Sequence, residues 1–582
     1  MEKAAKQAIK GAFKRAVFIF RRDHRLDDNT GLLWALKNSE VVYPVFVFDN
    51  KQITPDKNKF YGSNCVQFMC ESLEDLEKQL QGKGSHLNVL RGDYPDILVK
   101  IIDKVKPDVV CLNMDYTPYA KERDTIIEQT CKSHKVEFKS FEDITLVTTD
   151  AAKACYSGED SFFKKFTPYY NRAVQLTVRV PEACKQTNFA PESIQLEPQN
   201  LVTDFGKQFY KFNPTLITHG GRKSGLTELG RLGRLKDYNR MRDNPAKPTS
   251  LLSPHNKFGT VSVREVQKAA TEQLGKQDAE DFIRQLYWRD YYYFLGYFMP
   301  QMYTNPLDHK FSYVPWEDDP AKLEAWQDGA TGSPLVDAAM RQLKATGWLS
   351  NRMRLITSNY LIKDLHINWQ IGERYFASQL VDFDPAQNNG GWQWSAGCGY
   401  STQPYFRIYD PKVHIEKFDP YGTYIKKWIP ELEKVPMKSI INWESDWTMY
   451  PESKYPGPVV RHEVAKKRIM EMYQISLNTK PQKKGGKGGG YPENNKGEKK
   501  PEFKQDNRVK IMAPKYDDED DDEPLYVPKN APKSEALEKR PSTSAYPKEP
   551  QEGNPDEKYR KSYSNAKNEK ISWKVKPQDT NK

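Results

Sequence analysis

The chain has 582 residues, more than a single hydrophobic core usually serves, so we expect at least two domains. Its formal net charge of +11 and its aromatic content of 12% favour an acidic or flat partner such as nucleic acid, without assigning a function. The cysteines form no Cys-x-x-Cys pair and no apolar run reaches membrane length, which argues against a disulfide framework, a cysteine zinc site and a membrane span, and favours an intracellular, soluble protein.

Residues 1–14 are basic and mildly amphipathic, and we interpret them as a solvated extension rather than a targeting segment. Residues 15–145 alternate between short apolar runs and segments of helical period, which predicts a parallel α/β domain. We expect strands at 15–20, 41–48, 86–90 and 109–113, and helices near 30–37, 64–80, 95–105 and 119–133. The first strand leads into a polar loop without a G-x-G-x-x-G motif, and Asp28 or Asn29 is expected to cap the following helix.

Residues 146–225 show weak periodicity with scattered Pro and Gly, and we expect an interdomain connector that runs over the surface. Residues 226–476 have helical periodicity and few β-branched runs, which predicts an all-helical domain. Its expected helices lie at 281–299, 333–346, 348–365, 372–380 and 460–475. Residues 477–582 combine Lys/Gly-rich and acidic blocks with many Pro and Ser, so we expect a disordered, charged tail of unknown partner.

The segment 388–394 (Asn-Asn-Gly-Gly-Trp-Gln-Trp) concentrates indoles and amides shortly after the carboxylates of Asp382 and Asp384. A Gly pair lets backbone approach a flat group closely, because no Cβ stands in the way. Two interpretations follow from the residues alone. One is a pocket for a large aromatic ligand, and the other is a Trp-rich core with a Gly-bearing turn.

Motifs spread along the chain resemble those of the DNA photolyase/cryptochrome flavoprotein family. They are 20–32 (FRRDHRLDDNTGL), 288–290 (WRD), 348–354 (WLSNRMR), 369–376 (WQIGERYF) and 388–394, in the family's order. The likeness covers about residues 15–436 and is greatest to photolyases that repair cyclobutane pyrimidine dimers. It implies an α/β domain, a helical domain that binds FAD, and light-driven repair of damaged double-stranded DNA by a monomer, in the nucleus or wherever the DNA is.

The resemblance implies a set of residues that contact FAD. Asn388 matches the residue that faces flavin N5, where plant-type cryptochromes have an acid and insect types a thiol. Arg354 and Asp382 match an ion pair beside the flavin ring. The full set of matching residues is Tyr238, Thr249, Ser250, Leu251, Leu252, Ser253, Arg289, Arg354, Asp382, Asp384 and Asn388.

Trp392, Trp369 and Trp316 match the family's electron-relay tryptophans. Indole is readily oxidised, so a row of indoles can reduce a photoexcited flavin. Each of these residues taken singly is also compatible with core packing.

The substrate side of the resemblance has a departure at Gln285, where dimer photolyases usually have Glu. Gln still donates from its amide but brings no carboxylate, and it is also found here in six-four photolyases and animal cryptochromes. Leu355 stands where Met is common, a mild change. The histidines that six-four activity needs are replaced by Ser350, Asn351 and Leu355. The matching substrate and DNA residues are Trp288, Asn351, Arg352, Leu355, Trp394 and Arg407.

Two questions stay open in the sequence. The family often carries a second, light-harvesting chromophore of folate or deazaflavin type. Ala120, Met302 and Tyr303 stand where acidic and Cys/Lys contacts to a folate would be, so the sequence does not decide its presence. The alternative function is a cryptochrome-like blue-light receptor that signals through its C-terminal tail.

Overall fold

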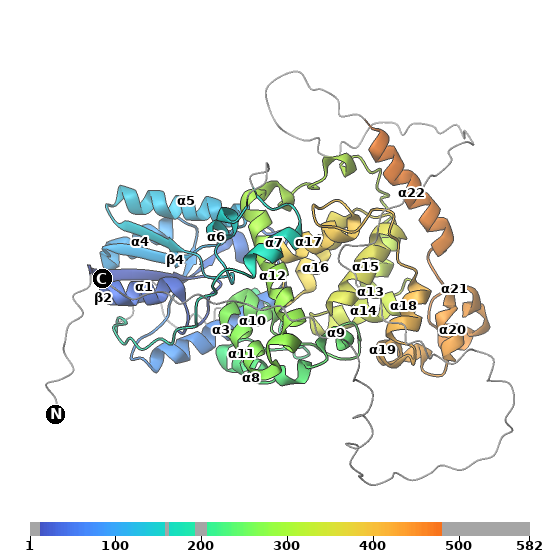
Figure 1. Ribbon diagram of the computed structural model, residues 1–582, viewed down its shortest axis with the longest axis horizontal. Coiled ribbons are helices and arrows are strands. Elements are labelled where there is room, and N and C mark those ends of the chain that lie inside the picture. Colours follow the sequence, from blue (N-terminus) through green and yellow to red (C-terminus); the bar gives the residue numbers. More distant parts are fainter. Residues whose placement is uncertain (1–11, 157–161, 192–205, 480–582) are drawn as a thin grey trace, which may run out of the picture. The chain divides into compact units, whose positions relative to one another are not determined.

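The computed structural model describes residues 12–156, 162–191 and 206–479 (Figure 1). It divides the chain into two compact units, Met1–Lys484 and Gly485–Lys582. The second unit, most of the expected tail and most of the expected N-terminal extension lie outside the described residues. No helix in the described ranges is long and apolar enough to cross a membrane.

A five-stranded parallel sheet forms the N-terminal part, as the alternating pattern predicted. The strand order is β3-β2-β1-β4-β5, and Ile19 at the centre pairs with Val45 on one side and Leu112 on the other. The strands are β1 (Phe13–Phe20), β2 (Ser39–Asp49), β3 (Asn88–Gly92), β4 (Val109–Asn113) and β5 (Glu137–Phe141). The sequence prediction missed β5, whose residues Glu-Phe-Lys-Ser-Phe are polar and only partly buried because the strand lies at the sheet edge.

Helices cover both faces of this sheet, because successive strand side chains point to opposite faces (Figure 1). Phe18 and Phe46 belong to the core shared with α1 (Thr30–Asn38) and α3 (Ser63–Gln81). Val17 and Ile19 belong to the core shared with α4 (Asp96–Val105) and α5 (Pro118–Ser133). Asn29 caps α1 by accepting a hydrogen bond from Leu32 N at 3.1 Å, as one of the two predicted candidates.

The segment 146–225 does not simply run over the surface. Its helix α7 (Phe166–Ala173) buries Phe166, Tyr169, Tyr170 and Ala173 in the core beside α12 (Lys276–Phe298). These positions follow helical spacing, so the sequence did carry a signal for a buried helix here. The expectation of a surface connector is therefore wrong for this stretch.

The remainder of the described chain is helical, in agreement with the predicted fold class of an α/β domain followed by an all-α domain. Besides the elements above, the helices are α2 (Asn50–Ile53), α6 (Thr149–Ala154), α8 (Arg222–Gly230), α9 (Tyr238–Met241), α10 (Ser253–Phe258), α11 (Val263–Leu274), α13 (Pro320–Asp328), α14 (Pro334–Thr346), α15 (Asn351–Lys363), α16 (Trp369–Gln379), α17 (Pro385–Ala396), α18 (Pro411–Phe418), α19 (Thr423–Trp428), α20 (Met437–Ile441), α21 (Trp443–Asp446) and α22 (His462–Asn478).

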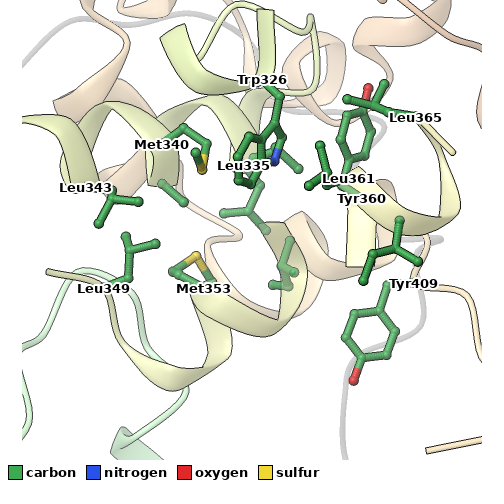
Figure 2. Packing of buried hydrophobic residues seen from close by; sticks show 14 of the residues in the cluster. Trp326, Leu335, Met340, Leu343, Leu349, Met353, Tyr360, Leu361, Leu365 and Tyr409 are labelled. Carbon is green, nitrogen blue, oxygen red and sulfur yellow. The ribbon is translucent and has the colours of Figure 1, made fainter. Parts of the chain in front are cut away.

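A large apolar core holds these helices together (Figure 2). Trp326 of α13 points into it beside Leu335 and Met340 of α14 and Met353 of α15. Trp369 and Trp392 belong to the same cluster. Burying one such side chain contributes roughly 1.5–3 kcal/mol, so this core fixes the positions of α15, α16 and α17.

Candidate functional site

The segment 388–394 lies within helix α17 rather than in a Gly-bearing turn. Asp384 caps the helix through Oδ1, which accepts from Ala386 N at 3.0 Å and Gln387 N at 3.3 Å. A Cβ on Gly390 would meet the ring of Tyr292 at 2.2 Å, whereas a Cβ on Gly391 would have nothing within 4 Å. The flat group that Gly390 admits is thus the chain's own Tyr292.

Helix α17 packs against α12, α15 and α16, and these helices carry many of the predicted site residues. Helix α12 carries Gln285, Trp288 and Arg289, and α15 carries Asn351, Arg352, Arg354 and Leu355. Tyr238 of α9 packs edge-on against Phe282 of α12. Thr249 to Leu252 form the loop that leads into α10, and Ser253 is the first residue of that helix. Arg407 is exposed in the irregular segment between α17 and α18.

Arg354 and Asp382, which the resemblance implies lie beside the flavin ring, form an ion pair. Arg354 Nη2 lies 2.8 Å from Asp382 Oδ2, and Arg354 Nε donates to Leu349 O at 3.0 Å. The Oδ1 atom of Asp382 is buried and has no partner among the described residues. A buried acceptor left without a donor is costly, so this oxygen is suited to accept from an N–H group of a ligand.

Asn388 is held by a residue that sequence reasoning missed. Its Nδ2 donates to the backbone carbonyl of Glu373 at 3.0 Å. The Glu373 carboxyl accepts from Asn389 Nδ2 at 2.9 Å, and Asn389 Oδ1 accepts from Gln393 Nε2 at 2.9 Å. Burial raises the pKa of Glu373 to about 7. Glu373 lies inside the motif at 369–376, and that place was the available signal.

Arg289 reaches the chain's own carbonyl groups. It donates to Ile144 O and to Asn256 O, the latter at 3.1 Å, and its guanidinium lies 4.8 Å from the ring centre of Tyr293. Its neighbour Asp290 accepts from Leu146 N at 2.7 Å. The contacts with Ile144 and Leu146 join α12 to the loop that follows β5, and the bond to Asn256 O joins α12 to α10.

The predicted relay tryptophans share one core and differ in burial. Trp392 and Trp369 are 2% and 3% exposed, and Trp316 is partly exposed against Tyr473. This gradient suits a path from the interior to the surface. A further indole, Trp326, lies 6.2 Å from Trp392 between ring centres and was not predicted. It is fully buried and donates to Thr357 O at 3.1 Å.

The predicted substrate residues are partly engaged within the protein. Trp288 stacks on Phe166 at 3.6 Å with an interplanar angle of 8°, so one of its faces is covered by a residue of α7. Gln285 Nε2 donates to Asp281 O of its own helix at 3.2 Å. Arg352 forms a two-point ion pair with Asp243 at 3.0 and 2.9 Å. Trp394 is half-buried and Asn351 is exposed at the start of α15.

Residues 16–187 match the family model described as DNA photolyase, and residues 282–475 match the model described as the FAD binding domain of DNA photolyase. A deoxyribodipyrimidine photo-lyase of Synechococcus sp. is 32% identical over 478 residues, which is 78% of this chain and 96% of the relative. The chain belongs to the DNA photolyase family.

Two solved photolyases share the fold. The archaeal photolyase from Sulfolobus tokodaii with two FAD molecules is 36% identical, with a TM-score of 0.69 over 79% of this chain and 100% of that chain. A bacterial class III photolyase from Agrobacterium tumefaciens is 29% identical, with a TM-score of 0.73 over 82% of this chain and 100% of that chain. The likeness thus spans both parts of this photolyase.

The residues present in this photolyase fit FAD. The unpaired Asp382 Oδ1 offers an acceptor, and the open space at Gly391 leaves room beside α17. Hydroxyls of Thr249, Ser250 and Ser253 line a loop in which Leu251 adopts a left-handed φ of 56°. Such backbone strain in a non-Gly residue clusters at ligand-binding loops. Hydroxyl and backbone donors in this loop suit a phosphate.

Ala120, Met302 and Tyr303 occupy the positions that match contacts to a folate antenna in the family. Ala120 and Met302 are each 1% exposed, and Tyr303 is packed against Gly296. Ala120 and Met302 therefore present little surface to a ligand, whereas Tyr303 is partly exposed. A cavity at the carboxyl ends of β2 and β3, lined by Asp49 and Tyr94, measures about 10 Å³.

Proposed function

We propose that this photolyase repairs cyclobutane pyrimidine dimers in DNA, using light and reduced FAD. The observation that carries the proposal is the arrangement of α17. This helix presents Asn388, Trp392 and Trp394 from one rigid element, beside the Arg354–Asp382 ion pair. Sites built on helices are held more precisely than sites built on loops.

FAD, when bound and reduced, would supply light-driven one-electron chemistry in which the dimer takes up an electron, splits and gives the electron back. The chain's residues bind and tune it. Asn388 places an uncharged amide, fixed by the Glu373 carbonyl, where the family faces flavin N5. The Arg354–Asp382 pair would add no net charge at the ring. The buried Asp382 Oδ1, which has no partner among the described residues, would accept a hydrogen bond from the flavin.

DNA recognition has an electrostatic and a stacking component. The net charge of +11 and the exposed Arg407 suit binding to phosphates. The indoles of Trp288 and Trp394 offer faces for a flipped dimer. Flipping costs a few kcal/mol and less for a damaged pair, so stacking offsets part of the cost. We further propose that the protein acts as a monomer, wherever the cell keeps its DNA.

Illumination of the reduced, FAD-loaded protein with an oligonucleotide that contains one cyclobutane dimer tests this proposal. We expect loss of the dimer under blue light and none in the dark, followed by chromatography of the digested DNA. A matched oligonucleotide with a six-four lesion is expected to remain unchanged. Persistence of the cyclobutane dimer under blue light, with the flavin shown to be reduced, would contradict the proposal.

A further inference from the structure

The parallel sheet has a topological switch point between β1 and β4. In the order β3-β2-β1-β4-β5, connections from β1 run to one side of the sheet and connections from β4 to the other. Folds of this type bind ligands in the crevice beyond the carboxyl ends of such strands. Here Arg21 and Arg22 follow β1 and Asp115 follows β4, so the chain's own charged side chains lie at this place.

Arg22 connects four separate elements from this position. Its guanidinium donates to Asp115 Oδ1 at 3.2 Å, Lys257 O at 3.3 Å, Tyr293 Oη at 2.5 Å and Asp384 Oδ2. Its side chain is 10% exposed and that of Asp384 is 5% exposed. Charge-assisted hydrogen bonds in such a buried setting are among the strong ones.

Asp384 is the residue through which Arg22 reaches the flavin side. Its Oδ1 caps α17, and its Oδ2 accepts from Arg22 and Tyr293. The helix then proceeds directly to Asn388, whose N–H donates to Asp384 O at 2.9 Å. A change at Asp384 therefore acts on the first turn of α17.

The electrostatics agree with this geometry. Burial by itself works against the Asp384 carboxylate, but Arg22 above all, followed by Lys257 and Arg289, outweighs burial and lowers the pKa of Asp384. Without Arg22, a buried carboxylate would lose its strongest partner, and such a loss is more costly than the absence of both charges.

We propose that Arg22 is a positioning residue that ties the sheet's switch point to the N-terminus of α17 and thereby sets Asn388 and Trp392 relative to the flavin. The inference rests on the proposed function for its consequence in repair, but not for its consequence in FAD binding. It assigns to the α/β domain a direct part in the geometry of the electron-transfer site.

Arg21 provides the matched control. Its side chain is 8% exposed, and its guanidinium pairs with Asp124 of α5 and donates to Asn113 O at the end of β4. Both partners lie within the sheet domain. Replacing Arg21 thus removes a similarly buried cation and ion pair next to Arg22 without touching Asp384 directly.

The experiment compares Arg22→Gln and Arg21→Gln in the full chain. FAD dissociation, the flavin absorption spectrum, photoreduction and the thermal unfolding midpoint are measured for each. We expect both variants to lower the midpoint. Only Arg22→Gln is expected to weaken FAD binding, by about tenfold (about 1.4 kcal/mol), to alter the flavin spectrum and to slow photoreduction.

Arg22→Lys is the second variant, and it covers the case in which Arg22→Gln does not fold. Lysine keeps the charge but has one donor centre, so we expect an intermediate FAD affinity. Unchanged FAD binding and flavin spectrum in the Arg22 variants, or equal changes in Arg21→Gln, would overturn the proposal. None of these readouts needs damaged DNA, so a failure of the repair assay in the unmodified protein is distinguishable from a failure of this inference.

Discussion

At the scale of single residues, Glu373 shows how one buried carboxyl shapes the flavin side. Its carbonyl orients Asn388 and its carboxyl accepts from Asn389. Because burial raises the pKa of Glu373 from 4.5 to about 7, the folded protein keeps this carboxyl protonated at a pH where the unfolded chain releases the proton. The contribution to stability is therefore fully present below pH 4.5 and is lost as the pH rises to about 7.

Glu373→Gln is expected to remove this pH dependence. The difference in the pKa of Glu373 between the unfolded and the folded state corresponds to about 3 kcal/mol of unfolding free energy at most. Above pH 7 the variant should therefore be more stable than the unmodified protein by up to that amount. The measurement is the difference in free energy of unfolding between the FAD-free proteins from pH 5 to pH 8. Burial also raises the pKa of Asp290 to about 7. Asp290 contributes the same pH dependence of the unfolding free energy to both proteins, so its contribution cancels in the difference. A pH-independent difference would argue against a protonated Glu373.

We propose that Gln285 lies in the lesion pocket, where it stands in place of the Glu that is usual in dimer photolyases. Its amide Nε2 donates to Asp281 O, a bond that a substrate group can replace by a small side-chain rotation. We expect Gln285→Glu to give an equal or higher repair yield, because a carboxylate binds thymine N–H groups more strongly. Gln285→Leu, which can neither donate nor accept, should lose about tenfold, the effect of roughly one strong hydrogen bond.

The repair yield per absorbed photon, measured under single-turnover conditions, checks both Gln285 variants. A large fall for Gln285→Glu would mean that the glutamine is adapted to another lesion. Equal yields for Gln285→Leu and the unmodified protein would instead place position 285 outside the pocket.

At the scale of elements, the glycine pair of α17 provides an internal comparison. An added Cβ at Gly390 would lie 2.2 Å from the Tyr292 ring, whereas at Gly391 it would meet no atom within 4 Å. Gly390→Ala should push α17 away from α12 and cost about 1–3 kcal/mol of stability. Gly391→Ala should be neutral or stabilising by up to about 1 kcal/mol, since alanine is the better helix former.

Thermal unfolding of the FAD-free variants tests the helix packing. A titration with FAD measures a second property of these variants, the affinity for FAD, because Gly391→Ala narrows the open space beside α17. If both variants lost equal stability, the close packing of α17 on Tyr292 would not be the reason for Gly390.

The sequence predicted elements well where one pattern dominated. Strand β4 was placed at its observed bounds because its first four residues are apolar, and α14 was placed within one residue. Strand β5 was missed because its edge position leaves it polar. Helix α7 was missed because a Pro and flanking irregular segments hid its buried aromatic face. Local pattern thus located elements with a clear inner face, and tertiary position decided the others.

At the scale of the whole molecule, contacts between distant segments could not be predicted from the sequence. The motifs identified Asp384 and Arg354, but not that Arg22 lies against the first of them or that Phe166 covers Trp288. These pairs are separated by long stretches of chain, and residues that lie far apart in sequence leave no periodic signal. The sequence therefore supplied the candidate residues, and the hydrogen bonds and ion pairs between them required the fold.

DNA binding combines a charge effect spread over the molecule with recognition by a few rings. Arg407 is exposed, so Arg407→Gln should weaken binding to damaged and undamaged DNA about equally. It should also reduce the slope of the logarithm of the association constant against the logarithm of salt concentration by about one counterion. Trp394→Ala should weaken the binding of damaged DNA only, by about 1–3 kcal/mol of binding free energy, because only a flipped base reaches an indole face. Equilibrium binding of matched damaged and undamaged duplexes across a salt series separates the two effects. A lesion-specific loss for Arg407→Gln would move that arginine from the phosphate face into the lesion pocket.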